Sequence, residues 1–262
     1  MPIATMHSET PATDPRSFML TFDDGPVPGK TDAVLATLSR YLGEDGQPIR
    51  AGFFMVGDAP VGFWPGRRYY APYEIWIHKG SMRRHPEIVA RVRAAGHLIG
   101  NHTTHHIWPR WPWYRSEARL TAELQAWETI AREAAEQDPT ARAGDESTTV
   151  TPRNASPRNE STRLFRTPYL ADTPELTRVA QTLGYQIIGG ETVGDASPEH
   201  TVQDVLKRVQ HLMETPQNDK TPVVLIFHDI LPLTVNHLGD VIDCLLDRGY
   251  ALRHFDPAHL AD

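Results

Sequence analysis

Short apolar runs alternate with longer amphipathic stretches from Ser17 to the end of this chain. Seven of the apolar runs have the composition of buried strands. These runs are Ser17–Phe22, Ala51–Val56, His97–Gly100, Arg163–Arg166, Tyr185–Gly189, Val223–Phe227 and Tyr250–His254. Strands that alternate with helices predict an α/β fold, in which a parallel sheet packs against outer helices. Seven such units favour a barrel over an open sheet, although the alternation is compatible with both.

The helical stretches carry periodicity and start signals. Apolar residues recur at steps of three and four over residues 202–213, which marks one face of a helix. Ser197-Pro198-Glu199 combines a capping residue, a proline and an early acid, so we expect this helix to begin there. Thr173-Pro174-Glu175 predicts the start of the preceding helix in the same way. An apolar stripe also predicts a long helix from about Ser116 to Glu136.

One domain is expected, with a short arm and two insertions. A chain of 262 residues suits a single core, which we expect over residues 17–262. Residues 1–16 are rich in Pro, Thr and Ser and are expected to form a loosely ordered arm. Residues 137–162 contain almost no large apolar side chains, which is typical of a mobile surface loop. Residues 58–84 carry six aromatic side chains, which could cover the core, line a ligand site or contact another subunit.

Composition excludes several classes of protein. The net charge of −7 argues against nucleic-acid binding, because neutralising phosphates requires clustered Lys and Arg. The longest apolar run has five residues, too few for a transmembrane segment. Cys244 is the single cysteine, which excludes an internal disulfide and a Cys-rich zinc module. The first residues do not resemble a signal peptide, so we expect a cytoplasmic protein if this N-terminus is native, and a secreted or periplasmic one otherwise.

Two adjacent carboxylates follow the first apolar run. Asp23 and Asp24 lie in the sequence TFDDGP, directly before a Gly-Pro turn. Active sites of parallel α/β proteins are built at the carboxyl ends of their strands. One carboxylate could therefore hold a metal ion while its neighbour acts on a water molecule. A turn in which both side chains cap backbone amides is the alternative.

A group of histidines follows the third run, in the sequence GNHTTHH. His102 and His106 are four residues apart, a spacing that lets two imidazoles reach one ion when the segment forms a helical turn. His105 is a rival partner at a spacing of three. Because the chain contains 13 histidines, chance clustering is the alternative.

An arginine and a further histidine follow two later runs. Arg166 begins the sequence RTPY, where it could hold Asp23 through a bidentate pair or form an ordinary ion pair on the barrel rim. His228 ends the sequence LIFH, and its place at the end of a strand indicates either a catalytic or a structural histidine.

The four motifs TFDDGP, H-T-x-x-H, R-x-P-Y and L-x-x-H-D occur in this order, each at the end of a predicted strand. Together they resemble the polysaccharide deacetylase family, which is carbohydrate esterase family 4 or the NodB-homology domain. The resemblance runs from about Ser17 to Phe255. It implies a distorted (β/α) barrel with about seven parallel strands that binds one divalent ion, most commonly zinc. By this resemblance the metal ligands are Asp24, His102 and His106, because the second histidine of the family motif lies four residues after the first.

The resemblance also implies the catalytic and binding roles. Asp23 corresponds to the general base, and Arg166 to the residue that orients it. His228 corresponds to the general acid. The backbone amide of Tyr169 is expected to donate to the oxyanion, and Leu225 to line the pocket for the acetyl methyl group.

One family motif differs here. After the fifth strand the family usually has an Asp followed by Trp, and the Asp pairs with the motif arginine. The stretch 189–195 contains no Trp, so Glu191 or Asp195 is expected to replace the partner of Arg166. Trp108 and Trp111 lie close after the histidines and could supply a sugar-binding platform, although burial against neighbouring loops is equally compatible.

These features predict a metal-dependent hydrolase that removes N-acetyl groups, or O-acetyl groups, from an amino-sugar oligomer or polymer by means of metal-activated water. Its partner is expected to be an acetylated carbohydrate. The altered motif, and first residues that do not resemble a signal peptide, motivate a second hypothesis, in which the substrate is a small acetylated or amide metabolite. A third hypothesis is a carbohydrate-binding relative that has lost catalysis.

Overall fold

The computed structural model describes residues 16–58, 80–137, 163–215 and 222–260. The expected arm lies outside this part of the chain except for its last residue, and so do residues 59–79 and 138–162 of the two expected insertions. Within the described residues, eight strands form one sheet in the order β5-β4-β3-β2-β1-β7-β6, and β8 pairs with β1. The strands are β1 (Ser17–Asp23), β2 (Gly52–Met55), β3 (Leu98–Asn101), β4 (Arg163–Phe165), β5 (Tyr185–Ile187), β6 (Glu191–Thr192), β7 (Val223–His228) and β8 (Ala251–Leu252).

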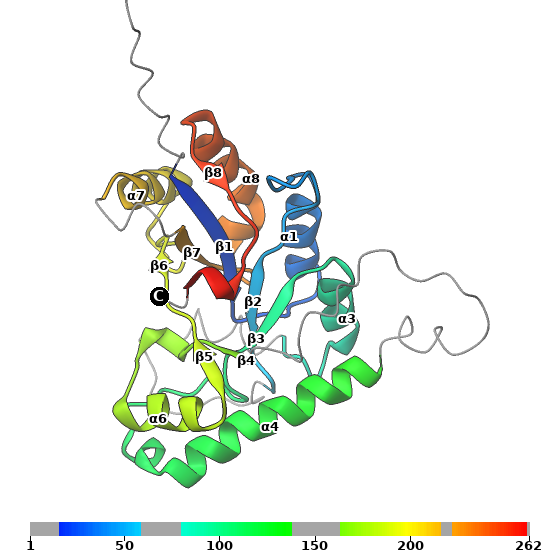
Figure 1. Ribbon diagram of the computed structural model, residues 1–262, viewed down its shortest axis with the longest axis vertical. Helices are drawn as coiled ribbons and strands as arrows, with labels where there is room; N and C mark the ends of the chain where they lie inside the picture. The colour runs from blue at the N-terminus through cyan, green and yellow to red at the C-terminus, as the bar shows by residue number, and fades with distance from the viewer. Residues whose placement is uncertain (1–15, 59–79, 138–162, 216–221, 261–262) are drawn as a thin grey trace, which may run out of the picture.

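The sheet is parallel throughout and curled, with helices around its outer face (Figure 1). The α-helices are α1 (Lys30–Leu38), α3 (Pro86–Ala94), α4 (Glu117–Glu136), α6 (Pro174–Thr182), α7 (Val202–Glu214) and α8 (Pro232–Asp247). Short 3-10 helices are η1 (Pro112–Arg115), η2 (Pro168–Leu170) and η3 (Pro257–Leu260). Within the described part, β5 and β6 end the strand order without pairing with each other, so the barrel is open between them. The predicted distorted (β/α) barrel is thereby confirmed.

All seven predicted strand regions contain a strand. The eighth strand, β6, was not predicted because Glu191–Thr192 is a polar pair with no apolar run. It pairs with β7 through Glu191↔Leu225 and Thr192↔Ile226. The predicted fifth strand is shorter than expected, since it ends at Ile187. The next two carbonyl groups, of Ile188 and Gly189, accept hydrogen bonds from the Arg166 side chain instead.

Successive side chains of β1 and β7 face opposite sides of the sheet, as a strand requires. On the outer side they join the main apolar core together with residues of α1, α7 and α8. These side chains are Phe18, Leu20, Phe22, Val223, Leu225 and Phe227. Met19 belongs to a separate inner cluster with Phe54 and Phe255. The alternation therefore directs Asp23 and His228, at the ends of the two strands, to the inside of the barrel.

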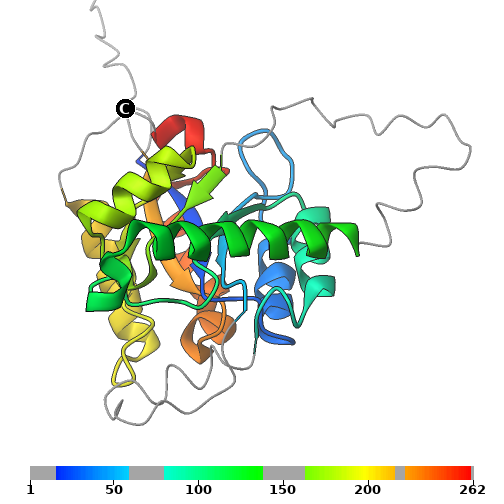
Figure 2. The ribbon, with the colours of Figure 1, turned by 90° about the horizontal axis from the view of Figure 1, so that it is seen from below.

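The predicted helices differ in how well their starts were placed. Helix α4 runs across β3 between α3 and α6, as Figure 2 shows, and its expected apolar stripe is buried. Helix α6 begins as predicted, with Thr173 Oγ1 accepting from the backbone N–H of Leu176 at 3.2 Å. The predicted start of α7 at Ser197 is wrong. Thr201 caps this helix instead, because its backbone N–H and hydroxyl donate to Asp204 Oδ2 at 2.9 and 2.7 Å.

Candidate active site

The carboxyl ends of the central strands bring the predicted site residues together. Asp23 ends β1 and lies in register with His228, which ends β7. His102 directly follows β3, and Arg166 directly follows β4. Because all of these strands are parallel, the four side chains lie at one edge of the sheet.

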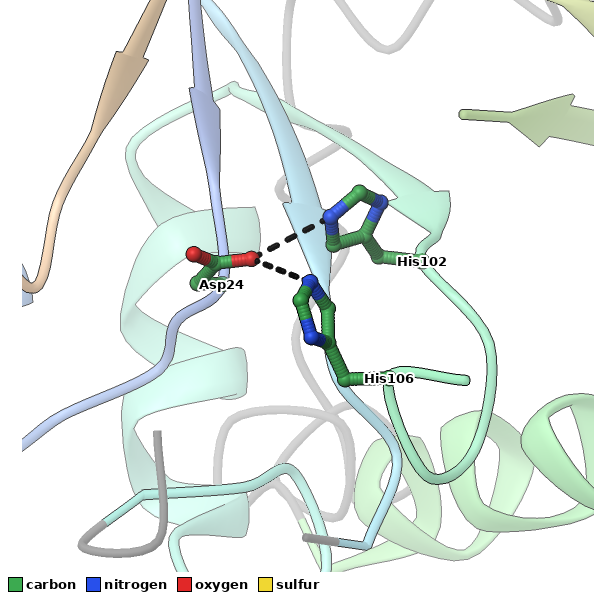
Figure 3. A group of neighbouring side chains, drawn as sticks. All are labelled: Asp24, His102 and His106. Carbon is green, nitrogen blue, oxygen red and sulfur yellow. Dashed lines mark ion pairs between the residues drawn. The ribbon is translucent and has the colours of Figure 1, made fainter. Parts of the chain in front are cut away.

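Asp24, His102 and His106 form a compact group of possible metal ligands (Figure 3). Oδ1 of Asp24 lies 3.2 Å from Nε2 of His102 and 3.0 Å from Nε2 of His106. All three residues are buried. Nδ1 of His102 lies 2.9 Å from the carbonyl oxygen of Arg166, and donation to this oxygen leaves the Nε2 lone pair directed at Asp24. One carboxylate and two imidazoles that converge in this way suit a divalent ion such as zinc.

His105, the rival ligand at a spacing of three, lies outside this group. Its ring pairs with Glu123 of α4, with Nδ1 2.9 Å from Oε2. Thr103 and His106 adopt left-handed backbone conformations (φ 64° and 48°), so the segment does not form a helical turn. Two histidines four residues apart therefore converge through a loop, and not through the helix on which the spacing argument was based.

Electrostatic coupling is strong within the group. Burial alone would raise the pKa of Asp24, but the charge of His106 and the hydrogen bonds of His102 and His106 hold the pKa of this carboxyl well below its usual value. Burial lowers the pKa of His106 against the opposing pull of Asp24. Both shifts are in the direction that a metal ion requires, because its ligands bind in their deprotonated forms.

Arg166 holds Asp23, although the contact differs from the expected bidentate pair. Nη1 donates to Asp23 Oδ1 at 2.7 Å and to Thr21 Oγ1 at 2.8 Å. Nε donates to the carbonyl oxygen of Ile188 and Nη2 to that of Gly189. The guanidinium carbon lies 4.1 Å from the centre of the Phe54 ring. Since Arg166 is fully buried, the alternative of an ion pair on the barrel rim is wrong.

The expected replacement partners of Arg166 both bind elsewhere. Glu191 lies 3.7 Å from Arg208. Asp195 holds His228, because Oδ2 accepts its backbone N–H at 2.8 Å and Oδ1 lies 2.9 Å from its ring Nδ1. The expectation that Glu191 or Asp195 would pair with Arg166 was therefore wrong, since backbone carbonyl groups accept from the N–H groups that a second carboxylate would have used.

Asp195 prepares His228 to carry a proton. Burial disfavours the charged imidazole, but the charge and hydrogen bond of Asp195, together with Asp24 and Asp23, outweigh it and raise the pKa of His228 to about 10. Thr234 Oγ1 also donates to Asp195 Oδ2, at 2.5 Å, and fixes the carboxylate. The sequence contains no local sign of these pairings, because Asp195 lies 33 residues from His228 and 39 from Thr234.

A cavity of about 620 Å³ opens over these groups. It is lined by several apolar residues and by the polar residues Asp23, Asp24, His102, His106, Tyr169 and His228. Leu225, the expected acetyl-pocket residue, is fully buried in the outer core. Ile226 lines the cavity in its place, because it shares the inner face of β7 with His228. The expectation for Leu225 was therefore wrong by one residue.

Neither expected platform indole lines this cavity within the described residues. Trp108 packs edge-on against the Tyr169 ring, with centroids 4.9 Å apart, and Trp111 packs against Trp113 at 4.3 Å. Tyr169 itself has a left-handed backbone conformation (φ 60°) and contacts the His106 ring at 4.5 Å. The oxyanion role of the Tyr169 amide stays a prediction.

These features define the class of this protein: an α/β barrel with a group of carboxylates and imidazoles in a cavity at the carboxyl ends of its strands. The family model described as "Polysaccharide deacetylase" matches residues 10–149. The chain belongs to the polysaccharide deacetylase family, which confirms the resemblance identified from its motifs. No helix among the described residues is long and apolar enough to cross a membrane.

Similar proteins are known both from sequence and from structure. A chitooligosaccharide deacetylase from Rhizobium leguminosarum bv. trifolii is 33% identical over 94 residues, which are 36% of this chain and 31% of that protein. The match thus spans about a third of that relative. A family 4 carbohydrate esterase from Streptomyces lividans, solved with acetate, has a TM-score of 0.60 at 18% identity and covers 93% of this chain and 94% of its own. A family 4 pseudoenzyme from Bacillus anthracis has a TM-score of 0.61 at 15% identity, covering 93% and 65%.

Proposed function

We propose that this chain is a metal-dependent deacetylase that hydrolyses N-acetyl groups, and by the same chemistry O-acetyl groups, of an amino-sugar oligomer or polysaccharide. One observation carries the proposal. A group of three possible metal ligands, a carboxylate held by Arg166 and a histidine held by Asp195 all face one cavity. The chitooligosaccharide deacetylase among the relatives supports the choice of substrate class.

Asp24, His102 and His106 would hold the ion. The buried donor atoms, which lie within 4.8 Å of one another, match the ligand types of catalytic zinc sites. When bound, a divalent ion supplies a Lewis acid and lowers the pKa of a coordinated water to about 7.

Asp23 and His228 would divide the proton transfers. Arg166 binds Oδ1 of Asp23, so Oδ2 is the oxygen suited to accept the proton of the attacking water. An amine leaves only once it is protonated. Asp195 holds Nδ1 of His228, so the opposite nitrogen, Nε2, would deliver that proton. A His228 that stays charged at neutral pH fits the role of acid.

Release of acetate from N-acetylglucosamine oligomers tests the proposal. We expect activity that a chelator removes and that added zinc restores. Asp23→Asn should lower kcat by about 10²- to 10⁴-fold, the usual contribution of a general base. Zinc content should stay at the wild-type level, because Asp23 is not part of the ligand group.

Asp240→Asn is the matched control, since this exposed aspartate pairs only with His237 among the described contacts and lies on the outer helix α8. Activity that persists in the chelator, or in Asp23→Asn, would contradict the proposal. Glycan binding without any acetate release would support the non-catalytic alternative, of which the pseudoenzyme among the structural neighbours is an example.

A second candidate substrate is a small amide that carries an apolar group. Leu170, Pro198 and Leu233 line the cavity, whereas the expected indole platform does not. Apolar walls favour apolar ligands over hydroxyl-rich sugars. Faster turnover of simple N-acetyl amines than of N-acetylglucosamine oligomers would favour this candidate.

A further inference from the structure

The loop between β3 and His106 has a conformation that other contacts must hold in place. Thr103 and His106 both adopt left-handed backbone angles. This region is unfavourable for residues with a Cβ atom, and it persists only where surrounding contacts fix it. The loop also carries both candidate ligand histidines, so whatever fixes its backbone also fixes the ligand geometry.

Glu123 of α4 lies directly against this loop and is 8% exposed. Its Oε1 accepts the backbone N–H of His105 at 2.6 Å, and its Oε2 lies 2.9 Å from the Nδ1 atom of the same residue. Its backbone carbonyl accepts from Thr104 Oγ1 at 2.7 Å. A single helical residue thus holds two consecutive loop residues, immediately before His106.

The surroundings of Glu123 do not otherwise favour a carboxylate. Leu120, Leu124 and Trp127 are its neighbours on the buried face of α4. A carboxylate among apolar side chains costs free energy unless it accepts hydrogen bonds. Within the described residues, both oxygens of this carboxylate find their partner in His105. The charge at position 123 therefore acts on the loop and not on the packing of the helix.

The two ligand histidines differ in their attachment. His102 is also fixed by the carbonyl oxygen of Arg166, 2.9 Å from its Nδ1. Glu123 acts on the other end of the loop, next to His106, and it is not itself one of the grouped ligands. We infer that Glu123 is a positioning residue, which keeps His106 directed at Asp24 and thereby sets the affinity of the site for a divalent ion. This inference rests on the proposed metal site.

The test measures zinc affinity and activity separately. The metal-free protein is titrated with zinc against a chromophoric chelator. Glu123→Ala should weaken zinc binding by about 10-fold, the lower end of the range for loss of a ligand's own hydrogen-bond partner, because Glu123 acts on His106 only through the neighbouring loop residues. At saturating zinc, its kcat for acetate release should fall by a smaller factor than its zinc affinity, because excess zinc refills the site by mass action. Glu123→Gln should restore most of the affinity, because its amide can accept from the His105 N–H and donate to the ring nitrogen.

Glu133→Ala is the matched control, because this glutamate is exposed on the same helix. If Glu123→Ala does not fold, zinc affinity is measured for Glu123→Asp instead. This variant keeps the charge but is one methylene too short to reach His105, so it should also bind zinc more weakly than wild type. A folded Glu123→Ala protein with wild-type zinc affinity would overturn the inference and leave the proposed function intact. A wild-type protein that binds no zinc would overturn the proposed function, and the inference with it.

Discussion

Several charges of this barrel are buried, and each has its own set of partners. Arg166 is fully buried and Asp23 is 4% exposed. Burying an ion pair costs free energy, which hydrogen bonds to the remaining donors offset. Here the guanidinium also donates to Thr21 and to two carbonyl groups, so its position is fixed from several sides. The side chain of Asp23 therefore faces the cavity in one orientation, as its proposed role of proton acceptor requires.

At this scale, the family resemblance identified the grouped side chains, which spacing alone had left open between His105 and His106, but it did not identify the pairs that support them. Asp24, His102 and His106 lie in short segments with recognisable order. Asp195 and His228 pair across 33 residues, and no local pattern encodes such a contact. The expectation for Leu225 came from the resemblance and conflicts with strand alternation, which places residue 226 and not residue 225 on the face of His228.

A buried histidine remote from the cavity should make stability depend on pH. Burial lowers the pKa of His97 from 6.5 to about 4, and its Nδ1 accepts the backbone N–H of Ala51 at 3.1 Å. The unfolded chain binds a proton below pH 6.5 and the folded chain only near pH 4. Stability is therefore complete above pH 6.5 and falls as the pH drops from 6.5 towards 4.

Urea unfolding at pH 7.5 and pH 5.0 measures this effect. The loss of unfolding free energy between the two pH values should be about 2 kcal/mol smaller in His97→Gln than in wild type. His259→Gln, at an exposed histidine, is the control and should lose as much unfolding free energy between the two pH values as wild type. Equal losses of unfolding free energy in wild type and His97→Gln would show that His97 does not cause the pH dependence.

At the scale of elements, periodicity predicted the strands and helices, and side-chain chemistry decided where they end. The polar strand β6 has no apolar run that would predict it, and it forms by backbone pairing with β7. The start of α7 was predicted at the wrong residue because the sequence contains two possible helix starts, Ser197-Pro198 and Thr201–Asp204. The helix begins at the second, where Thr201 and Asp204 form a capping box. The displaced segment lines the cavity through Ser197 and Pro198.

The turn after β1 allows a close approach that only glycine permits. A Cβ atom on Gly25 would lie 2.3 Å from Oδ2 of Asp229, a buried side chain held by Thr31. Gly25→Ala should therefore lower the free energy of unfolding by about 1–3 kcal/mol, the usual cost of overpacking. It should also weaken zinc binding, because Asp24 is the preceding residue. Gly189→Ala is the control, since a Cβ there meets no atom within 4 Å. Unchanged stability and zinc affinity in Gly25→Ala would contradict this reading of the turn.

At the scale of the whole molecule, stability and chemistry occupy different parts of the barrel. The main core lies between the sheet and the outer helices, whereas the cavity lies at the carboxyl ends of the strands. The alternation of strands and helices predicted this architecture because each parallel pairing needs a helical crossover. The open side between β5 and β6 was not predictable, since apolar patterning does not specify where a parallel barrel fails to close.

The proposed ion would connect distant parts of this architecture. Asp24 follows β1, whereas His102 and His106 follow β3, so a bound ion links two segments that β2 separates in the sheet. An ion that binds only the folded chain stabilises it by about 2.7 kcal/mol at a hundredfold excess over Kd. For a protein of this size, that gain corresponds to a rise in Tm of roughly 5–10 °C. Calorimetry of the metal-free protein with and without zinc measures the shift, which His106→Ala should abolish and His259→Ala should preserve. A shift of equal size in His106→Ala would mean that zinc binds elsewhere on the chain.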